Sequence, residues 1–134
     1  MTDRSNAKKK YYRRDSDECN VSKGEGMTDA IYLIRKKTYD EVGGLDEAYF
    51  MYGEDIDLCY TLLRKGFKNY YYGKSSILHY KGESSVKDKI YYDRFYGAMQ
   101  IFLNKYYKKQ NPVKFQILSA GLKTKHLLEL SKLK

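Results

Sequence analysis

The 134-residue sequence has no tryptophan, one proline, two cysteines and no long apolar run. A helix that spans a bilayer needs about 20 mostly apolar residues, so we expect no membrane-crossing segment. The first residues are polar and charged, so we expect no signal peptide. Cys19 and Cys59 form no metal or redox motif. We therefore expect both to be reduced thiols in a cytoplasmic protein.

The charge of the sequence is unevenly placed. Residues 1–24 hold seven Lys/Arg against four Asp/Glu, residues 25–104 hold eleven against twelve, and residues 105–134 hold eight against one. Basic ends attract nucleic acid or anionic lipid non-specifically, and they also occur as solvated tails. The neutral centre argues against a basic binding surface over the folded part. Its many tyrosines, sixteen in the whole chain, fit a protein with broad polar clefts.

The pattern of apolar residues and turns predicts one α/β domain, a short mixed sheet with flanking helices and a long C-terminal helix. Expected divisions are a polar arm or loop (1–26), a folded domain (27–110) and a basic amphipathic helical tail (111–134). Strands are expected at 28–36, 67–72 and 76–80. Helices are expected at 37–42, from Glu54 to Lys65 and at 88–109, the last broken by Pro112, with a helical tail from 113.

An acid cluster, Glu54-Asp55-x-Asp57, opens the predicted helix directly after an aromatic loop. A carboxylate at this position can take a proton from a substrate hydroxyl in a cleft. Capping and complementing the helix dipole would by themselves explain one or two of these acids. Spacing alone leaves both interpretations open.

A histidine, His79, ends a predicted strand and is followed by Lys81 in a loop rich in glycine and serine. Such a pair can meet a metal ion or a phosphate, although a lone histidine is more often structural. Asp15-Ser16-Asp17 spells the D-x-D metal motif of many enzymes that use sugar nucleotides. Because no apolar strand precedes it to hold the carboxylates, we reject it as a metal site.

The segment V-G-G-L-D-E-A-Y-F-M-Y-G-E-D-I-D-L-C at 42–59 is similar to G-G-F-D-E-x-F-F-x-Y-x-E-D-x-D-L of family 2 glycosyltransferases of the rhamnosyltransferase type. Residues 63–72 look like the family's R-K-A-G-Y-K-x-Y-Y, and residues 77–85 look like its I-x-H-x-x-G-x-S. About 80 residues match in order and spacing. The departures are Thr28-Asp29-Ala30 for the usual Ser-Gly-Ala, and Tyr60-Thr61 for an arginine-bearing turn.

The resemblance implies the acceptor-side half of a GT-A fold, in which an inverting transferase moves a sugar from a nucleotide-diphosphate sugar to a hydroxyl. Asp55 would be the general base. Acceptor-binding residues would be Glu54, Asp57, Asp46 and Glu47. His79 and Lys81 would meet the donor diphosphate or a Mg or Mn ion, and no nucleotide-binding residue is expected in this chain.

The resemblance also implies partners. The substrates are a nucleotide-sugar and a glycan or lipid-linked acceptor in cell-surface polysaccharide synthesis. A second chain would bind the donor, and without it we expect no activity. A half-domain is expected to self-associate through its exposed face. The tail is expected either to lie on the cytoplasmic membrane face or to pack on the domain. The alternative function is a non-enzymatic basic module that binds nucleic acid or anionic membrane.

Overall fold

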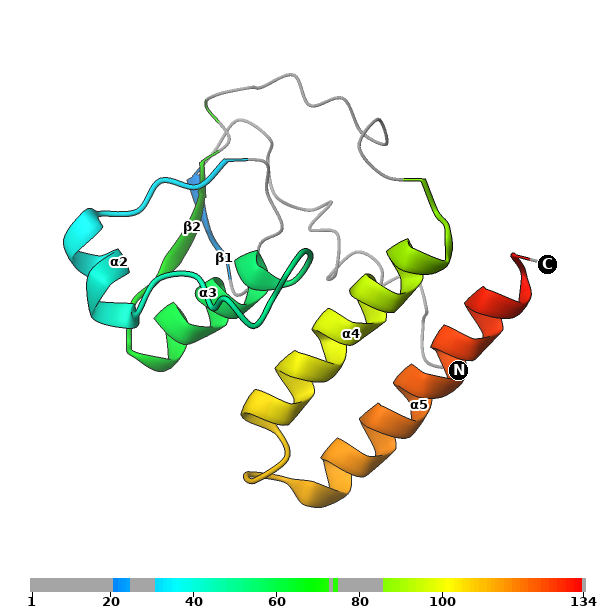
Figure 1. Cartoon of the computed structure of the whole chain (residues 1–134). Helices are drawn as coiled ribbons and strands as arrows, with labels where there is room; N and C mark the ends of the chain where they lie inside the picture. The colour runs from blue at the N-terminus through cyan, green and yellow to red at the C-terminus, as the bar shows by residue number, and fades with distance from the viewer. Residues whose placement is uncertain (1–20, 25–30, 73, 75–85, 134) are drawn as a thin grey trace, which may run out of the picture.

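The computed structural model describes residues 21–24, 31–72, 74 and 86–133. Its elements are β1 (Val21–Gly24), α2 (Lys36–Val42), α3 (Glu54–Arg64), β2 (Asn69–Tyr72), α4 (Lys89–Tyr106) and α5 (Pro112–Ser131). In Figure 1, α4 lies between α5 on one side and α2, α3 and the two strands on the other. The helices and the small sheet agree with a partial domain that mixes helices and strands, but the described strands are antiparallel rather than the mixed sheet expected.

The two strands form a small antiparallel sheet beside α3. Val21 lies opposite Tyr72, and Gly24 lies opposite Asn69. The buried Asn69 side chain donates a hydrogen bond from Nδ2 to the carbonyl oxygen of Cys59, at 3.0 Å. This bond ties the start of β2 to the middle of α3.

A small apolar core joins α2 to α3. Its buried residues are Val42 from α2 and Leu58 and Leu62 from α3, and the half-buried Ile34, Tyr39 and Phe67 pack around them. The core residues of α3 are four apart, so they lie on one face of the helix. That face holds α3 against α2, while a different face is left to meet α4.

The turn after α2 requires two glycines. Gly43 and Gly44 have φ of 94° and 73°, a left-handed conformation in which any other residue is strained. A Cβ on Gly44 would also lie 3.0 Å from the ring of Tyr39, whose hydroxyl accepts a hydrogen bond from the Leu45 backbone N–H. The turn ends α2 at Val42, which is where the sequence predicts the end of this helix.

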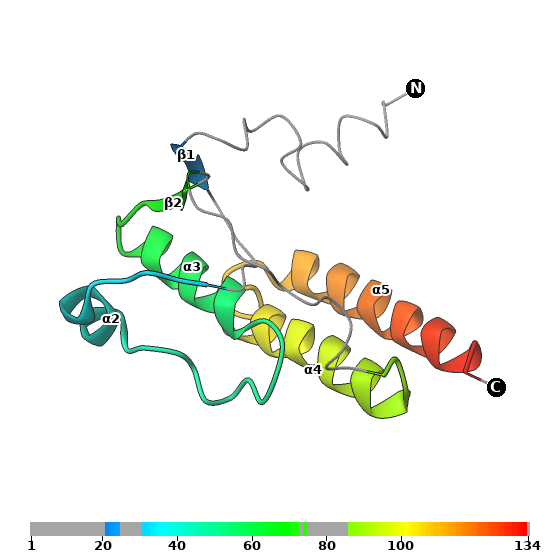
Figure 2. The same cartoon turned by 90° about the horizontal axis from the view of Figure 1, so that it is seen from above.

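The last two helices form an antiparallel hairpin, side by side in both views (Figures 1 and 2). The carboxylate of Asp88 caps α4 by accepting from the Tyr91 N–H at 2.7 Å, and the side chain of Asn111 caps α5 by accepting from the Lys114 N–H at 3.0 Å. Pro112 is the first residue of α5, where its missing N–H costs nothing. The prediction that Pro112 breaks the preceding helix is therefore corrected: α4 has already ended at Tyr106.

The predicted strand at 28–36 is wrong over the part that the structure describes. Residues 31–35 form neither strand nor helix, Lys36 already begins α2, and Leu33 is 98% exposed. A strand depends on cross-strand partners, and no described strand pairs with this segment. Conversely, β1 lies in the stretch expected to lack regular structure, because its polar sequence gives no strand signal.

The other predicted elements agree within a few residues. The helices expected at 37–42, from Glu54 and at 88–109 are observed as α2, α3 and α4, and the strand expected at 67–72 as β2. The strand expected at 76–80 lies outside the described residues, and the domain boundaries stay predictions. Among the described residues, no helix combines the length and apolar character needed to cross a membrane.

Candidate functional site

The loop before α3 enters the helix through two left-handed residues. Tyr52 and Gly53 have φ of 70° and 87°. A tyrosine pays a strain of about 1–3 kcal/mol for this conformation, and two edge-on ring contacts to α4 offset it. Its ring centroid lies 5.4 Å from that of Tyr91 and 5.9 Å from that of Phe95. The loop thereby fixes the first turn of α3 against α4.

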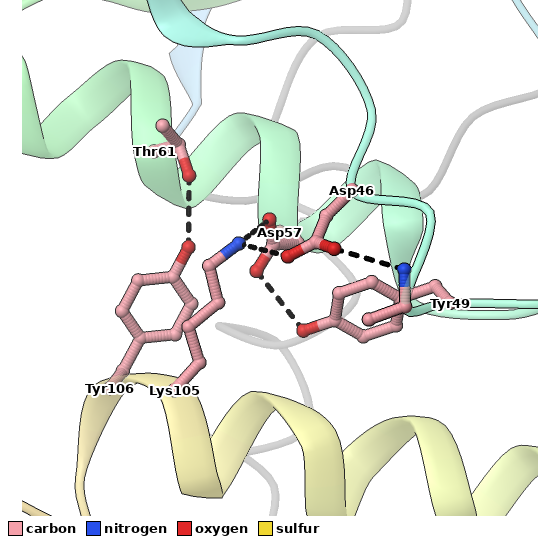
Figure 3. A network of polar contacts seen from close by, with 7 residues as sticks. Asp46, Tyr49, Asp57, Thr61, Lys105 and Tyr106 are labelled. Atoms are coloured by element: carbon pink, nitrogen blue, oxygen red, sulfur yellow. Dashed lines mark hydrogen bonds and ion pairs between the residues drawn. The ribbon is translucent and has the colours of Figure 1, made fainter.

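A buried carboxylate, Asp57, lies at the centre of a polar network that joins this loop, α3 and α4 (Figure 3). The Tyr49 hydroxyl donates to its Oδ1 at 3.0 Å, and Lys105 Nζ donates to its Oδ2 at 2.7 Å. Lys105 also donates to Oδ2 of Asp46, at 2.6 Å. Both oxygens of Asp57 are thus occupied by groups of this chain.

The ionisation of this network follows from its geometry. The hydrogen bond from Lys105, supported by the Ala48 backbone N–H, holds the pKa of Asp46 below its usual value. Burial works against the charge of Lys105, but its bonds to Asp46 and Asp57 outweigh this and raise its pKa. Burial and the neighbouring charge of Asp57 raise the pKa of Tyr49. At neutral pH, the lysine is therefore charged and the tyrosine is neutral.

Aromatic contacts also hold α3 against α4. The ring of Tyr60 packs edge-on against Phe102 and Tyr106, with centroids 5.2 Å and 4.5 Å apart. The hydroxyls of Thr61 and Tyr106 lie 2.9 Å apart in a hydrogen bond. Tyr60 and Thr61, which depart from the family pattern, are therefore used here for contact with α4.

A cleft of about 710 Å³ opens beside this network. It lies between the turn after α2, one face of α3 and the end of α4. Three of the predicted acceptor-binding residues, Asp46, Glu47 and Asp57, line it together with cations from α3 and α4. The other lining residues are Val42, Gly43, Gly44, Leu45, Thr61, Arg64, Lys65, Lys105 and Tyr106.

The predicted general base, Asp55, does not line this cleft. Consecutive helical residues are about 100° apart, so Asp55 and Asp57 point to nearly opposite sides of α3. Asp55 is half-buried, and its Oδ1 accepts from the Ile56 backbone N–H at 2.7 Å. The acid cluster is thus divided between two faces.

The remaining acid of the cluster is Glu54, at the first position of α3. Its side chain is half-buried, and within the described part of the chain its buried Oε2 has no hydrogen-bond partner. A buried carboxylate oxygen is costly to leave without a donor. Within the described residues, Glu54 is therefore the acid of the cluster whose buried oxygen lacks a donor.

The described residues do not fit the divalent metal implied by the resemblance. No group of three or more His, Cys, Asp or Glu side chains comes together within the described ranges. Asp46 and Asp57 converge on the ammonium of Lys105, which fills the position where a cation would sit. His79 and Lys81 lie outside the described residues.

Three residues of the network, Lys105, Tyr49 and Tyr106, are not predicted from the sequence. Lys105 is 48 positions from Asp57, in the last turn of a helix where a lysine needs no special explanation. Tyr49 is one of several tyrosines in its loop. No short-range pattern in the sequence distinguishes these residues from their neighbours.

Comparisons with known proteins agree with the resemblance. The sequence profile of the family described as glycosyltransferase like family 2 matches residues 1–92. The N-acetylglucosaminyl-diphospho-decaprenol L-rhamnosyltransferase of Mycobacterium tuberculosis is 34% identical over 77 residues, which cover 58% of this chain and 25% of that protein. The rhamnosyltransferase WbbL of Escherichia coli K12 is 42% identical over 51 residues, covering 38% and 19%. No solved structure shows a significant match.

These matches bear differently on the activity of the chain and on its family. The chain spans about a quarter or less of the length of these relatives, so their complete activity is not carried over by similarity alone. The family profile, in contrast, covers more than half of the chain. The chain belongs to the glycosyltransferase-like family 2.

Proposed function

We propose that this chain is the acceptor-side part of an inverting glycosyltransferase of GT-A fold that acts in cell-surface polysaccharide synthesis. The enzyme would move a sugar from a nucleotide-diphosphate sugar to a hydroxyl of a glycan or lipid-linked acceptor. Family membership supports the reaction class. The names of the relatives favour L-rhamnose as the sugar and an N-acetylglucosaminyl-diphospho-polyprenol as the acceptor.

One observation carries the assignment of the site within this chain. Asp57 is occupied by Lys105 and Tyr49, whereas the buried Oε2 of Glu54 has no partner among the described residues. We therefore assign the acceptor hydroxyl to Glu54, and the resemblance adds its neighbour Asp55 as the base. In the proposed assignment Glu54 binds the acceptor hydroxyl that reacts, and Asp46 and Glu47 contact a more distant part of an extended acceptor from the cleft.

In the proposed reaction, Asp55 takes the proton of the acceptor hydroxyl. The oxygen forms a bond to the anomeric carbon from the side opposite the diphosphate. The bond from that carbon to the diphosphate breaks, and the nucleoside diphosphate leaves with the electron pair. Positioning supplies much of the rate of such a displacement, so we propose that transfer also needs a donor-binding segment beyond the described residues.

The proposal is tested first by acceptor binding. Titration calorimetry of the chain with a short-chain N-acetylglucosaminyl-diphospho-prenol is expected to show binding that Glu54→Gln weakens. The expected loss is about tenfold, the cost of one hydrogen bond to a charged group. Asp40→Asn is the matched control, because Asp40 is exposed and pairs with Lys36 one helical turn away. Equal affinity of all three proteins would remove Glu54 from the acceptor site.

Transfer itself is tested with the donor-binding segment supplied. The chain is fused behind the preceding segment of WbbL, and transfer of labelled L-rhamnose from its nucleotide donor to the same acceptor is measured. The fusion is expected to be active, and Asp55→Asn is expected to lower its turnover by about a hundredfold or more. Full turnover by the Asp55→Asn fusion would show that Asp55 is not the base.

A further inference from the structure

The helix α5 has apolar residues on two opposite faces. One face packs against α4, where Ser119 is buried, Gln100 donates to its hydroxyl at 3.2 Å, and His126 stacks on Tyr96 with ring centroids 4.9 Å apart. The partly buried Phe115 and other half-buried residues complete this inner face. Packing on α4 therefore explains the apolar residues of this inner face.

The opposite face is exposed. At about 100° per residue, Val113, Ile117, Leu127 and Leu128 fall on one side of the helix, with the exposed Ala120 between them. Val113, Ile117 and Leu127 are 67%, 67% and 66% exposed. We call these five residues the outer stripe. Nothing in the described part of the chain covers the stripe, although its residues are as apolar as those that face α4.

Lysines border the outer stripe on both sides. Lys123 lies about a quarter turn to one side, and Lys114, Lys125 and Lys132 lie about a quarter turn to the other. All four are exposed. The acid of this helix, Glu129, is already paired with Lys125 at 2.8 Å and with Lys132 at 3.0 Å.

We propose that the outer stripe of α5 lies flat on an anionic lipid surface. Its aliphatic side chains would enter the boundary between headgroups and acyl chains, while the lysine stems reach sideways and place their ammonium groups among the lipid phosphates. The charge supports this occupant, because residues 105–134 hold eight lysines against one acid. An anionic surface complements both the apolar stripe and its basic borders.

The same charge disfavours two other occupants. A second copy of this face would bring lysines against lysines around the buried stripe, and like charges there repel. Nucleic acid would meet the lysines but would gain little from aliphatic side chains, since its bases stack on aromatic rings. The outer stripe carries none.

Vesicle co-sedimentation of the unmodified chain tests the proposal. Vesicles of phosphatidylcholine with phosphatidylglycerol are expected to bind the chain, and vesicles of phosphatidylcholine alone are expected to bind it far more weakly. No sugar nucleotide or acceptor is present. The result is therefore separate from the transferase proposal, and either can fail while the other holds.

Two pairs of variants show whether the outer stripe is responsible. Ile117→Asp is expected to weaken binding to the anionic vesicles about thirtyfold, from the burial of one large aliphatic side chain. Val86→Asp is its control, because Val86 is 81% exposed and lies outside α5. Lys123→Glu is expected to weaken binding at least about fivefold, and Lys37→Glu, at an exposed site on α2, is its control. Circular dichroism checks that each variant is folded.

Each remaining outcome overturns the proposal. Unchanged binding by Ile117→Asp would mean that charge alone attracts the chain and that the stripe does not enter the lipid. Absence of vesicle binding, together with a dimer in light scattering that Ile117→Asp dissociates, would assign the stripe to a second copy. Absence of both would show that the stripe does not dock on lipid.

Discussion

At the scale of single residues, the acids of Glu54-Asp55-x-Asp57 differ in burial and in hydrogen-bond partners. Asp57 is 3% exposed and shares Lys105 with Asp46. A carboxylate so deeply buried is tolerated only with a partner of opposite charge and a hydrogen-bond donor, and it has both. These contacts hold α4 and the loop against α3.

Removal of Lys105 tests this structural role. Lys105→Met is expected to lower the free energy of unfolding by about 2 kcal/mol, because it leaves the buried charge of Asp57 without its cation. Lys36→Met is the control, since the pair that Lys36 forms with Asp40 is exposed and worth less than about 0.5 kcal/mol. Urea unfolding measures both. Similar losses in the two variants would contradict the structural role of Lys105.

The raised pKa of Tyr49 predicts an alkaline effect on stability. Burial and the charge of Asp57 favour the neutral phenol in the folded chain. The contribution of Tyr49 is therefore complete below the unfolded pKa of about 10, and it declines as the pH rises above that value. Urea unfolding from pH 9 to 11 is expected to show a shallower decline in Tyr49→Phe than in the unmodified chain. Parallel declines would disprove the effect.

At the scale of elements, the helices follow from the sequence and the strands largely do not. The apolar spacing of α3, the caps Asp88 and Asn111, and Gly43-Gly44 are local signals, and local signals determine where helices begin and end. A strand depends on the neighbour that it pairs with. The sequence therefore predicts a strand over residues 31–35, where none forms, and misses β1, which pairs with β2.

Part of the candidate site can likewise be predicted from the sequence, and part cannot. The acid cluster and the cleft residues Asp46 and Glu47 are recognisable from the sequence, because they lie in one continuous motif. The network around Asp57 is not, because it depends on the contact between α3 and the distant end of α4. His79 and Lys81 stay predictions.

Alanine substitutions at two glycines are expected to change stability in opposite directions. Gly44→Ala is expected to lower stability by about 1–2 kcal/mol, because its φ is positive and a Cβ would meet the ring of Tyr39. Gly97→Ala, in the middle of α4, is expected to raise it by about 0.5–1 kcal/mol, because a Cβ there meets nothing within 4 Å and alanine favours the helix. Thermal unfolding is expected to move Tm down for the first variant and up for the second. The same direction of change in both would contradict the backbone argument.

At the scale of the whole molecule, α4 is the element that joins the rest. It contacts the loop and α3 through Lys105, Phe102 and Tyr106, and it contacts α5 through Tyr96 and Gln100. The family profile ends at residue 92, within the first turn of this helix. The part of the chain that resembles its relatives is therefore stabilised by a part beyond the match.

Removal of α5 tests that dependence. A chain that ends at residue 110 exposes the inner face of α4, including Tyr96, which is 8% exposed in the complete chain. We expect a lower Tm and aggregation in light scattering, because a new apolar surface meets water. A shortened chain that stays monomeric with an unchanged Tm would show that the hairpin contributes nothing to the remainder.

The ion pair between Asp57 and Lys105 also has an evolutionary consequence. A descendant that lost the lysine alone would keep a buried negative charge. One that lost the aspartate alone would leave the lysine with one of its two described acidic partners, Asp46. The two positions are therefore expected to mutate together across related genes, despite the 48 residues between them. Their joint variation would record the contact between α3 and α4 in sequences alone.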